Sequence, residues 1–332
     1  MSAHGIQQSP AGSPGARAGS PRWRGVPRFA SGPAFIGAAA VWIATWLIAG
    51  HGFFGTLSIG VTVATFLVIV GIGQMFVITS GSGAIDLSVP YVMTLSAYLG
   101  TQVMNGDNGK LVAGLAAALL CGLVAAALNI ILIEVVGIPP LVGTLAVGFV
   151  IQTVILVHSS SSNGVPSPAL ATFVNAKWGP LPVFGLLGIA VAVIFAVVLK
   201  RTSYGRRVEA VGQSDTAARL AGISPHRVRA VAYLISALMA ALAGMFLAAY
   251  SGGASLDLGT PYQLASIAVV VLGGSLIAGG RSTVSGVWAA AVMLTILITL
   301  VNVTHASSGV QDILEGGLIV LVLAFASSPS RT

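Results

Sequence analysis

The sequence has very little charge. Only 7% of its 332 residues are Asp, Glu, Lys or Arg, whereas 56% are hydrophobic and the mean hydropathy is +0.96. A soluble domain carries about 25% charged residues, so this chain has too few charges to cover a surface that faces water. Membrane lipid must therefore contact most of its outer surface, which excludes a soluble globular protein. The formal net charge of +7 does not indicate a nucleic-acid partner, because the basic residues gather in a few short segments.

Cysteine and lysine are also scarce, and each scarcity excludes a kind of site. Cys121 is the only cysteine, so we expect no disulfide and no cysteine-based metal centre. Lysine occurs only at Lys110, Lys177 and Lys200, and none of them completes a phosphate-binding loop of the form G-x-x-x-x-G-K-[ST]. The chain also lacks H-E-x-x-H and a nucleophile elbow. We therefore expect a protein that is not an enzyme, with no cofactor and no nucleotide-hydrolysing site of its own.

Long apolar runs, separated by charges, glycine or proline, predict an all-α polytopic membrane protein. Because about 20 apolar residues cross the hydrocarbon core, these runs predict about ten transmembrane helices within one domain at 34–326. The predicted spans are 34–50, 57–79, 88–104, 111–136, 141–158, 181–199, 230–250, 262–279, 284–304 and 309–326. Residues 1–33, rich in Ser, Gly, Pro and Arg, predict a disordered basic tail, and 327–332 form a short C-terminal tail.

Lysine and arginine lie mainly on one side of this predicted topology. Only Lys110 and Lys177 fall on the outer side. The remaining basic residues are Arg17, Arg22, Arg24, Arg28, Lys200, Arg201, Arg206, Arg207, Arg219, Arg227, Arg229, Arg281 and Arg331. Cytoplasmic loops of membrane proteins carry this excess of positive charge. The bias predicts an even number of spans, with both termini in the cytoplasm.

The longest predicted cytoplasmic segment, 200–229, contains the signals for a short helix. The helix and its caps comprise Ser214, Asp215, Ala217, Ala218, Arg219, Ala221 and Gly222. Ser214 or Asp215 can cap the N-terminus, and Gly222 can end the helix in the left-handed conformation. The alanine-rich face is smooth enough to sit in a groove on a partner protein. The alternative is an ordinary helix of a solvated loop.

A few polar residues interrupt the apolar runs and are candidates for a substrate pathway. They are Gln74, Asp86, Asn129, Gln152 and Asn302. An ionisable residue at membrane depth is costly and indicates a function by default. The alternative for each is an interhelical hydrogen bond, and Asp86 together with Ser88 can instead cap the next helix.

Three blocks of sequence occur in the order and spacing of a known family. Residues 84–89 read AIDLSV, residues 202–223 contain TSYGRR, AVG and AARLAGI, and residues 267–280 contain IAVVVLGG followed by GG. With these blocks, from about residue 70 to the C-terminus, the chain resembles the permease subunits of ribose-type ABC sugar importers. Pro90, Gln263 and Ala265 depart from the family's pattern, which leaves the exact substrate open.

The resemblance implies a permease of the bacterial inner membrane that imports a monosaccharide, such as ribose or xylose, or a similar polar small molecule. It implies a second permease copy in a homodimer, a cytoplasmic ABC ATPase that uses ATP, and a periplasmic or lipoprotein sugar-binding protein. The short helix within 200–229 would then couple the permease to the ATPase. The alternatives are an ion-coupled secondary transporter, a membrane protein with no transport role, and an ABC permease for branched-chain amino acids or nucleosides.

Overall fold

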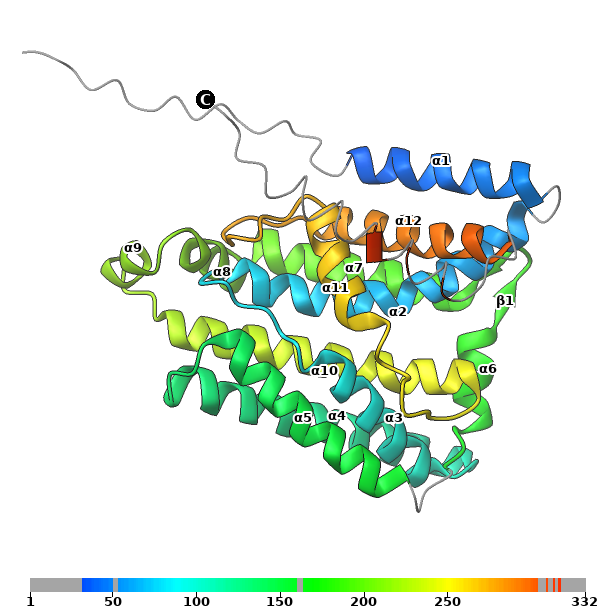
Figure 1. Cartoon of the computed structure of the whole chain (residues 1–332), viewed down its shortest axis with the longest axis horizontal. Helices are drawn as coiled ribbons and strands as arrows, with labels where there is room; N and C mark the ends of the chain where they lie inside the picture. Colours follow the sequence, from blue (N-terminus) through cyan, green and yellow to red (C-terminus); the bar gives the residue numbers. More distant parts are fainter. Residues whose placement is uncertain are drawn as a thin grey trace, which may run out of the picture.

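The computed structural model is a bundle of long helices that run side by side along its longest axis (Figure 1). It describes residues 32–49, 53–159 and 164–303, and single positions at 309, 313, 316 and 317. The predicted tail at 327–332, nearly all of the tail at 1–33, and all but those single positions of the span at 309–326 lie outside the described residues.

The elements follow one another in chain order. The helices are α1 (Gly32–Ala49), α2 (Phe53–Thr79), α3 (Val89–Met104), η1 (Asn108–Lys110), α4 (Leu111–Ile130), the π-helical turn η2 (Ile131–Val135), α5 (Pro140–Ser159), α6 (Pro168–Asn175), α7 (Val183–Arg201), α8 (Ser203–Gln213), α9 (Asp215–Leu220), α10 (Pro225–Ser251), α11 (Tyr262–Leu272) and α12 (Val284–Val303). Two short strands, β1 (Lys177–Trp178) and β2 (Leu181–Pro182), form an antiparallel hairpin before α7.

Six helical segments among the described residues are long and apolar enough to cross a membrane. They are 53–79, 108–135, 140–159, 183–201, 225–251 and 284–301. Each coincides with a predicted span to within a few residues. The structure therefore supports a polytopic α-helical membrane protein, whereas the predicted count of about ten spans is not confirmed.

The predicted span at 262–279 is wrong as a single crossing helix. Helix α11 has only 11 residues, or roughly 16 Å, against about 30 Å of hydrocarbon. The helix stops at Gly273, and Gly274 follows with a φ of +83°. Glycine adopts this left-handed conformation without the clash that a Cβ causes. The rest of the predicted span then runs through turns up to α12.

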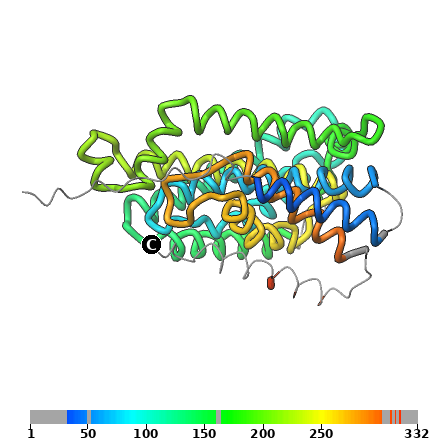
Figure 2. Tube along the Cα trace, turned by 90° about the horizontal axis from the view of Figure 1, so that it is seen from above, coloured from blue at the N-terminus to red at the C-terminus, as the bar shows by residue number. Residues whose placement is uncertain are grey.

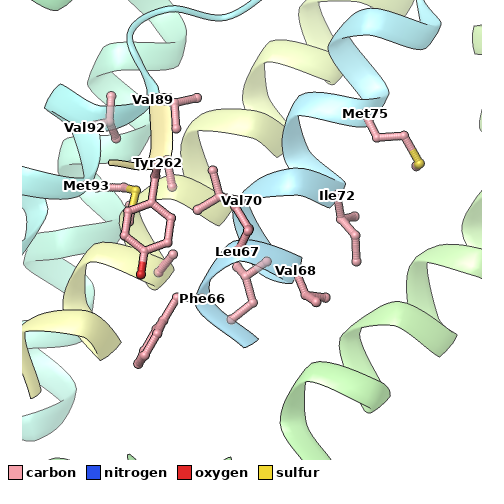
Figure 3. Packing of buried hydrophobic residues seen from close by; sticks show 14 of the residues in the cluster. Phe66, Leu67, Val68, Val70, Ile72, Met75, Val89, Val92, Met93 and Tyr262 are labelled. Carbon is pink, nitrogen blue, oxygen red and sulfur yellow. The ribbon is translucent and has the colours of Figure 1, made fainter. Parts of the chain in front are cut away.

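Helices α2 and α10 form the centre of the bundle. Helix α10 packs against α2, α3 and α4, and nearly all of α2 beyond Val61 is buried. Figure 3 shows side chains of α2, such as Phe66 and Val70, in the same buried cluster as Met93 of α3 and Tyr262 of α11. Helices that are apolar all round are buried ones, which explains why α2 needs no polar face.

Small residues bring the helix backbones of this core close together. A Cβ on Gly73 would lie 2.9 Å from the Cα of Ser236, and one on Gly122 would lie 2.8 Å from the carbonyl oxygen of Ala237. Both glycines therefore face the backbone of α10. Close approach at small residues is how membrane helices gain packing contacts.

Helices α8 and α9 lie at one end of the longest axis, and the β1–β2 hairpin lies at the other (Figures 1 and 2). We refer to these as the α9 end and the hairpin end. The connections α2–α3 and α11–α12 also lie at the α9 end. Gly280 donates a hydrogen bond to the carbonyl of Thr79 at 2.9 Å, and Gln213 of α8 donates to the carbonyl of Gly280 at 3.4 Å.

Candidate coupling site and buried polar cluster

The predicted coupling segment 200–229 contains two helices where the sequence analysis expected one. Thr202 caps the start of helix α8, because its Oγ1 accepts the N–H of Gly205 at 3.2 Å. Its apolar side chains Val208 and Val211 are buried against the bundle. The hydroxyl of Tyr204 also donates to the carbonyl of Val228 in α10 at 3.3 Å. Helix α8 is therefore fixed against the membrane helices.

The caps of α9 are those that the sequence predicts. The Oγ of Ser214 accepts the N–H of Ala217 at 3.2 Å. Gly222 has a φ of +75°, and the N–H of Ile223 donates to the carbonyl of Ala218 at 2.9 Å. The left-handed conformation of Gly222 and the hydrogen bond from Ile223 to Ala218 end the helix as in a Schellman motif. Helix α10 then starts at Pro225, directly after its N-cap residue Ser224.

The exposed surface of α9 differs from the smooth alanine face that the sequence indicated. Ala218 is 3% exposed and packs on the chain's own core, whereas Leu220 is 86% exposed. Ala217, Arg219 and Ala221 are exposed as well. The surface available to a partner is therefore centred on Leu220, which the sequence analysis did not single out.

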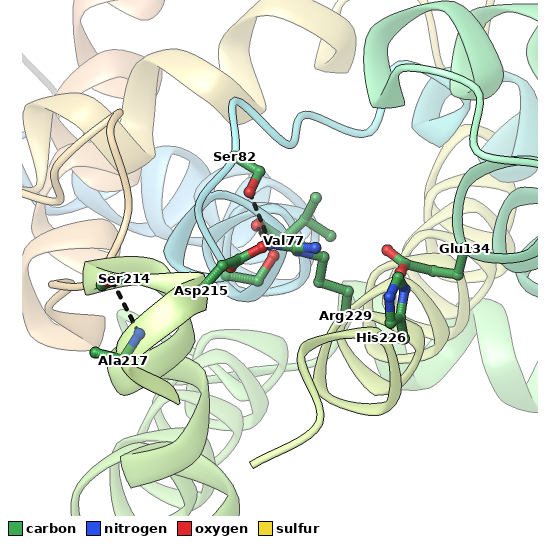
Figure 4. Close-up of polar contacts among 9 residues, drawn as sticks. Val77, Ser82, Glu134, Ser214, Asp215, Ala217, His226 and Arg229 are labelled. Atoms are coloured by element: carbon green, nitrogen blue, oxygen red, sulfur yellow. Dashed lines mark hydrogen bonds and ion pairs between the residues drawn. The ribbon is translucent and has the colours of Figure 1, made fainter. Parts of the chain in front are cut away.

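Arg229 of α10 holds the N-terminus of α9. Its Nη2 donates to both carboxylate oxygens of Asp215, at 2.5 and 2.6 Å. The same nitrogen donates to the Oγ of Ser82, in the connection between α2 and α3, at 2.7 Å. Figure 4 shows the three side chains meeting between these elements. The sequence analysis identified Arg229 only as one of many basic residues at this side of the protein.

Asp86, in the same α2–α3 connection, is the centre of a buried polar cluster. Its Oδ1 accepts the hydroxyl of Ser88 at 2.5 Å and the N–H of Ser88 at 3.0 Å, and its Oδ2 accepts the hydroxyl of Ser236 at 2.8 Å. The amide of Asn129 donates to the Oγ of Ser88 at 2.9 Å. Gln74, with its amide oriented to suit both partners, bonds the backbone N and O of Asp86 at 3.2 and 3.3 Å.

The structure brings together three of the five candidates for a substrate pathway. Gln74, Asp86 and Asn129 are all buried in this cluster. Helix α10 bonds the Asp86 carboxylate through Ser236, α2 bonds the Asp86 backbone, and α4 bonds Ser88. Gln152 is exposed on α5 and does not join them. Asn302 lies near the end of α12, and its side chain is outside the described residues. The role of all five in transport stays a prediction.

Two of the three sequence blocks of the family resemblance meet at the α9 end, beside the start of the connection that carries the third. Gly212, which ends the AVG block, packs so closely that a Cβ there would overlap the carbonyl oxygen of Thr79 and the backbone nitrogen of Gly280. The side-chain amide of Gln213 donates to the carbonyl of Gly280 at 3.4 Å. The α2–α3 connection, the end of α8 and the α11–α12 connection thus form one junction of backbones, which we call the glycine junction (Thr79, Gly81, Gly212, Gly279 and Gly280).

Two further charged contacts lie at the α9 end. The Nδ1 of His226 and the Oε2 of Glu134 are 2.6 Å apart and join the start of α10 to η2. On α8, partial burial raises the pKa of the Glu209 carboxyl, while Arg281 and Lys200 act in the opposite direction. Within the described residues, no group of three or more His, Cys, Asp or Glu side chains is arranged to hold a metal ion.

The fold and the α9 end define a multi-pass α-helical membrane protein with a capped helix exposed at one end of the bundle. Residues 56–323 match the family described as "Branched-chain amino acid transport system / permease component". The chain belongs to this family of transport permeases. The resemblance to the permeases of ribose-type ABC importers is thereby confirmed, and the ABC permease is favoured over an ion-coupled transporter.

Individual relatives agree with this assignment. The chain is 32% identical over 266 residues to the ribose import permease protein RbsC of Bacillus subtilis, covering 77% of this chain and 79% of the relative. It is 31% identical over 250 residues to the autoinducer 2 import system permease protein LsrD of Photorhabdus laumondii, covering 73% and 74%. It is 32% identical over 268 residues to a probable ABC transporter permease protein of Sinorhizobium fredii, covering 80% and 79%. No solved structure matches the chain.

Proposed function

We propose that the chain is the transmembrane permease subunit of an ABC importer for a monosaccharide, ribose-like or xylose-like, or a similar polar small molecule. A separate cytoplasmic ATPase drives it, and this chain hydrolyses no ATP itself. The ribose and autoinducer 2 permeases among its relatives support a small hydroxylated substrate. ATP binding would close the ATPases and move α9, and the permease would then open its pathway alternately to each side of the membrane.

The observation that carries this proposal is the exposure of Leu220 on α9. Burying a leucine side chain is worth about 1.5–3 kcal/mol relative to leaving it in water. Leu220 is 86% exposed at the tip of a helix that is firmly capped at both ends. A groove on the ATPase that covers Leu220 would gain this free energy, with Arg219 placed beside it for a charged partner.

The orientation and the remaining partners follow from charge. Lys200, Arg201, Arg206 and Arg207 lie at or next to α8, at the α9 end. Since cytoplasmic surfaces carry the excess of Lys and Arg, we place this end in the cytoplasm of the inner membrane, with both termini on the same side. The hairpin end then faces a periplasmic or lipoprotein binding protein, and a second copy of the chain completes a homodimer within the lipid.

The docking surface is tested by affinity purification of the tagged chain from detergent-solubilised membranes, with the retained proteins identified by mass spectrometry. We expect the wild type to retain an ATPase that contains a phosphate-binding loop, and Leu220→Asp to lose it. Leu181→Asp is the matched control, because Leu181 is 58% exposed in the hairpin at the opposite end. If Leu220→Asp retains as much ATPase as Leu181→Asp, the docking assignment is wrong.

The substrate class is tested on the binding protein that accompanies the chain. Its melting temperature is measured with ribose, xylose, leucine and adenosine in turn. We expect a rise with a pentose. A rise with leucine alone would instead favour a branched-chain amino acid importer, the activity in the family's description, and a rise with adenosine a nucleoside importer.

A further inference from the structure

Helix α10 donates hydrogen bonds to the α2–α3 connection at two points. We call residues 80–88 the linking segment. Arg229 donates to Ser82 at its start, and Ser236 donates to Asp86 near its end, at 2.7 and 2.8 Å. Arg229 and Ser236 are seven residues apart, which places them two turns apart on the same face of an α-helix. One face of α10 therefore fixes the linking segment along most of its length.

Arg229 adds a third element to this contact. The same Nη2 that bonds Ser82 also bonds Asp215, the first residue of α9. The Arg229 side chain is only 9% exposed, and that of Asp215 is 32% exposed. A guanidinium buried to this extent depends on its acceptors, because removing one partner leaves an uncompensated charge. All of these bonds come from Nη2, at the end of the guanidinium, a position that the shorter side chain of lysine does not reach.

These contacts, together with the backbone of the linking segment, form a continuous path from the exposed helix to the membrane core. The path runs from Asp215 through Arg229 to Ser82, and along the linking segment to Asp86. From there it reaches Asn129 and Ser236, on the membrane helices α4 and α10. The contact between His226 of α10 and Glu134 of η2 includes neither α9 nor the linking segment.

Resting on the function proposed above, we infer that Arg229 is a positioning residue that makes α9 and the linking segment move as one unit. A displacement that the ATPase imposes on α9 then pulls Ser82 and shifts the Asp86 cluster between α2, α4 and α10. The glycine junction keeps the backbones in contact, but it joins α8, not α9, to the linking segment. Without the guanidinium, α9 can move while the linking segment stays in place.

The first test uses the full chain alone, in lipid nanodiscs, and measures amide hydrogen exchange by mass spectrometry. Arg229→Gln is expected to speed exchange about tenfold in residues 80–88 and 214–222 together, since truncating one partner of a buried charge pair loosens the contact by at least that factor. Arg227→Gln is the matched control, because Arg227 is exposed two residues away on the same helix, and both segments should keep their wild-type exchange. Faster exchange in only one segment, or in neither, would overturn the inference.

A general loosening of the bundle is distinguished with a conservative variant. If Arg229→Gln also speeds exchange in the core of α3, exchange in Arg229→Lys distinguishes loss of this contact from general loosening of the bundle. Lysine keeps the charge, but its shorter side chain does not bring the ammonium to the position of Nη2, so we expect intermediate exchange in both segments with α3 unchanged. Wild-type exchange in both segments of Arg229→Lys would show that a charge alone suffices and would contradict the positioning role.

The second test uses the complex retained by the tagged chain, reconstituted with its binding protein. It measures radiolabelled ribose taken up per ATP hydrolysed. Arg229→Gln should retain the ATPase as well as Arg227→Gln does, while the ratio falls about tenfold. An unchanged ratio, with both rates lowered equally, would contradict the inference. If the wild type retains no ATPase, the proposed function fails instead, and the exchange test still reports on the contact itself.

Discussion

The replacement of Gly212 by alanine is predicted to break the glycine junction. A Cβ at this position would overlap the carbonyl oxygen of Thr79 and the backbone nitrogen of Gly280. Both obstacles are backbone atoms, so neither can retreat by rotating a side chain. The two atoms also share the hydrogen bond from Gly280 to Thr79 at 2.9 Å, which an intruding methyl group would force apart.

The size of the effect follows from two contributions. Overpacking by one carbon in a tightly packed region costs about 1–3 kcal/mol. Losing a backbone hydrogen bond between buried groups adds about 1 kcal/mol. We therefore expect Gly212→Ala to destabilise the α9 end by about 2–4 kcal/mol, partly offset by the higher helix propensity of alanine, which is worth less than about 1 kcal/mol.

The assay is the apparent melting temperature of the purified chain, followed by tryptophan fluorescence in detergent at a fixed heating rate, because membrane proteins usually unfold irreversibly. Gly55→Ala is the control. It is the same chemical change within a helix, but a Cβ there meets nothing within 4 Å. We expect a clear drop for Gly212→Ala and none for Gly55→Ala. Equal melting temperatures for the two variants would refute the close packing of α8 against the two connections.

Three other substitutions give separate tests. Gly222→Pro should reduce the ATPase retained in the purification about tenfold with the chain still in the membrane, because proline fixes φ near −65° where Gly222 has +75°. Asp86→Leu should lower the apparent melting temperature strongly, since three donors lose their acceptor at about 1–3 kcal/mol each, whereas Gln152→Leu on the exposed side of α5 should not. Glu209→Gln should raise the melting temperature slightly at pH 7. The folded state raises the pKa of Glu209 above 4.5, so ionisation costs stability as the pH rises through the folded pKa. The gain should vanish below pH ~4, where the carboxyl is protonated in both states; a gain that persists there would exclude this cause.

Much of the architecture could be predicted from local sequence. The long spans follow from hydropathy, because lipid requires about 20 apolar residues for each crossing. The caps of α9 follow from Ser214 and Gly222, whose side chains and conformations determine where a helix begins and ends. These features depend on residues that are neighbours in the chain.

Other features depend on contacts that a single sequence does not show. Helix α8 was expected to be part of a loop, because charged and polar residues dominate its sequence. Its few apolar side chains form a buried face only when the bundle covers them. Helix α11 was expected to be longer, because the apolar residues after Gly274 continue the hydropathy signal although the helix has ended.

The same limit applies to the candidate site. Asp86 and Asn129 were chosen separately as polar residues in apolar runs, and the structure joins them through Ser88. The burial of Arg229 and the exposure of Leu220 had no distinct signal, since an arginine near a helix start and a leucine in a short helix are both common. The contact of Arg229 with Ser82, and the position of Leu220 at the tip of the bundle, arise only when the chain folds.

The central claim is that ATP hydrolysis by a separate subunit drives this permease. The most direct measurement is uptake of radiolabelled ribose by proteoliposomes that contain the complex purified through the tagged chain, together with its binding protein. The account predicts that uptake requires ATP on the side of the ATPase, is lost with Leu220→Asp, and is unaffected when ion gradients are collapsed. Purification of the chain alone, with uptake that follows an ion gradient and ignores ATP, would contradict it.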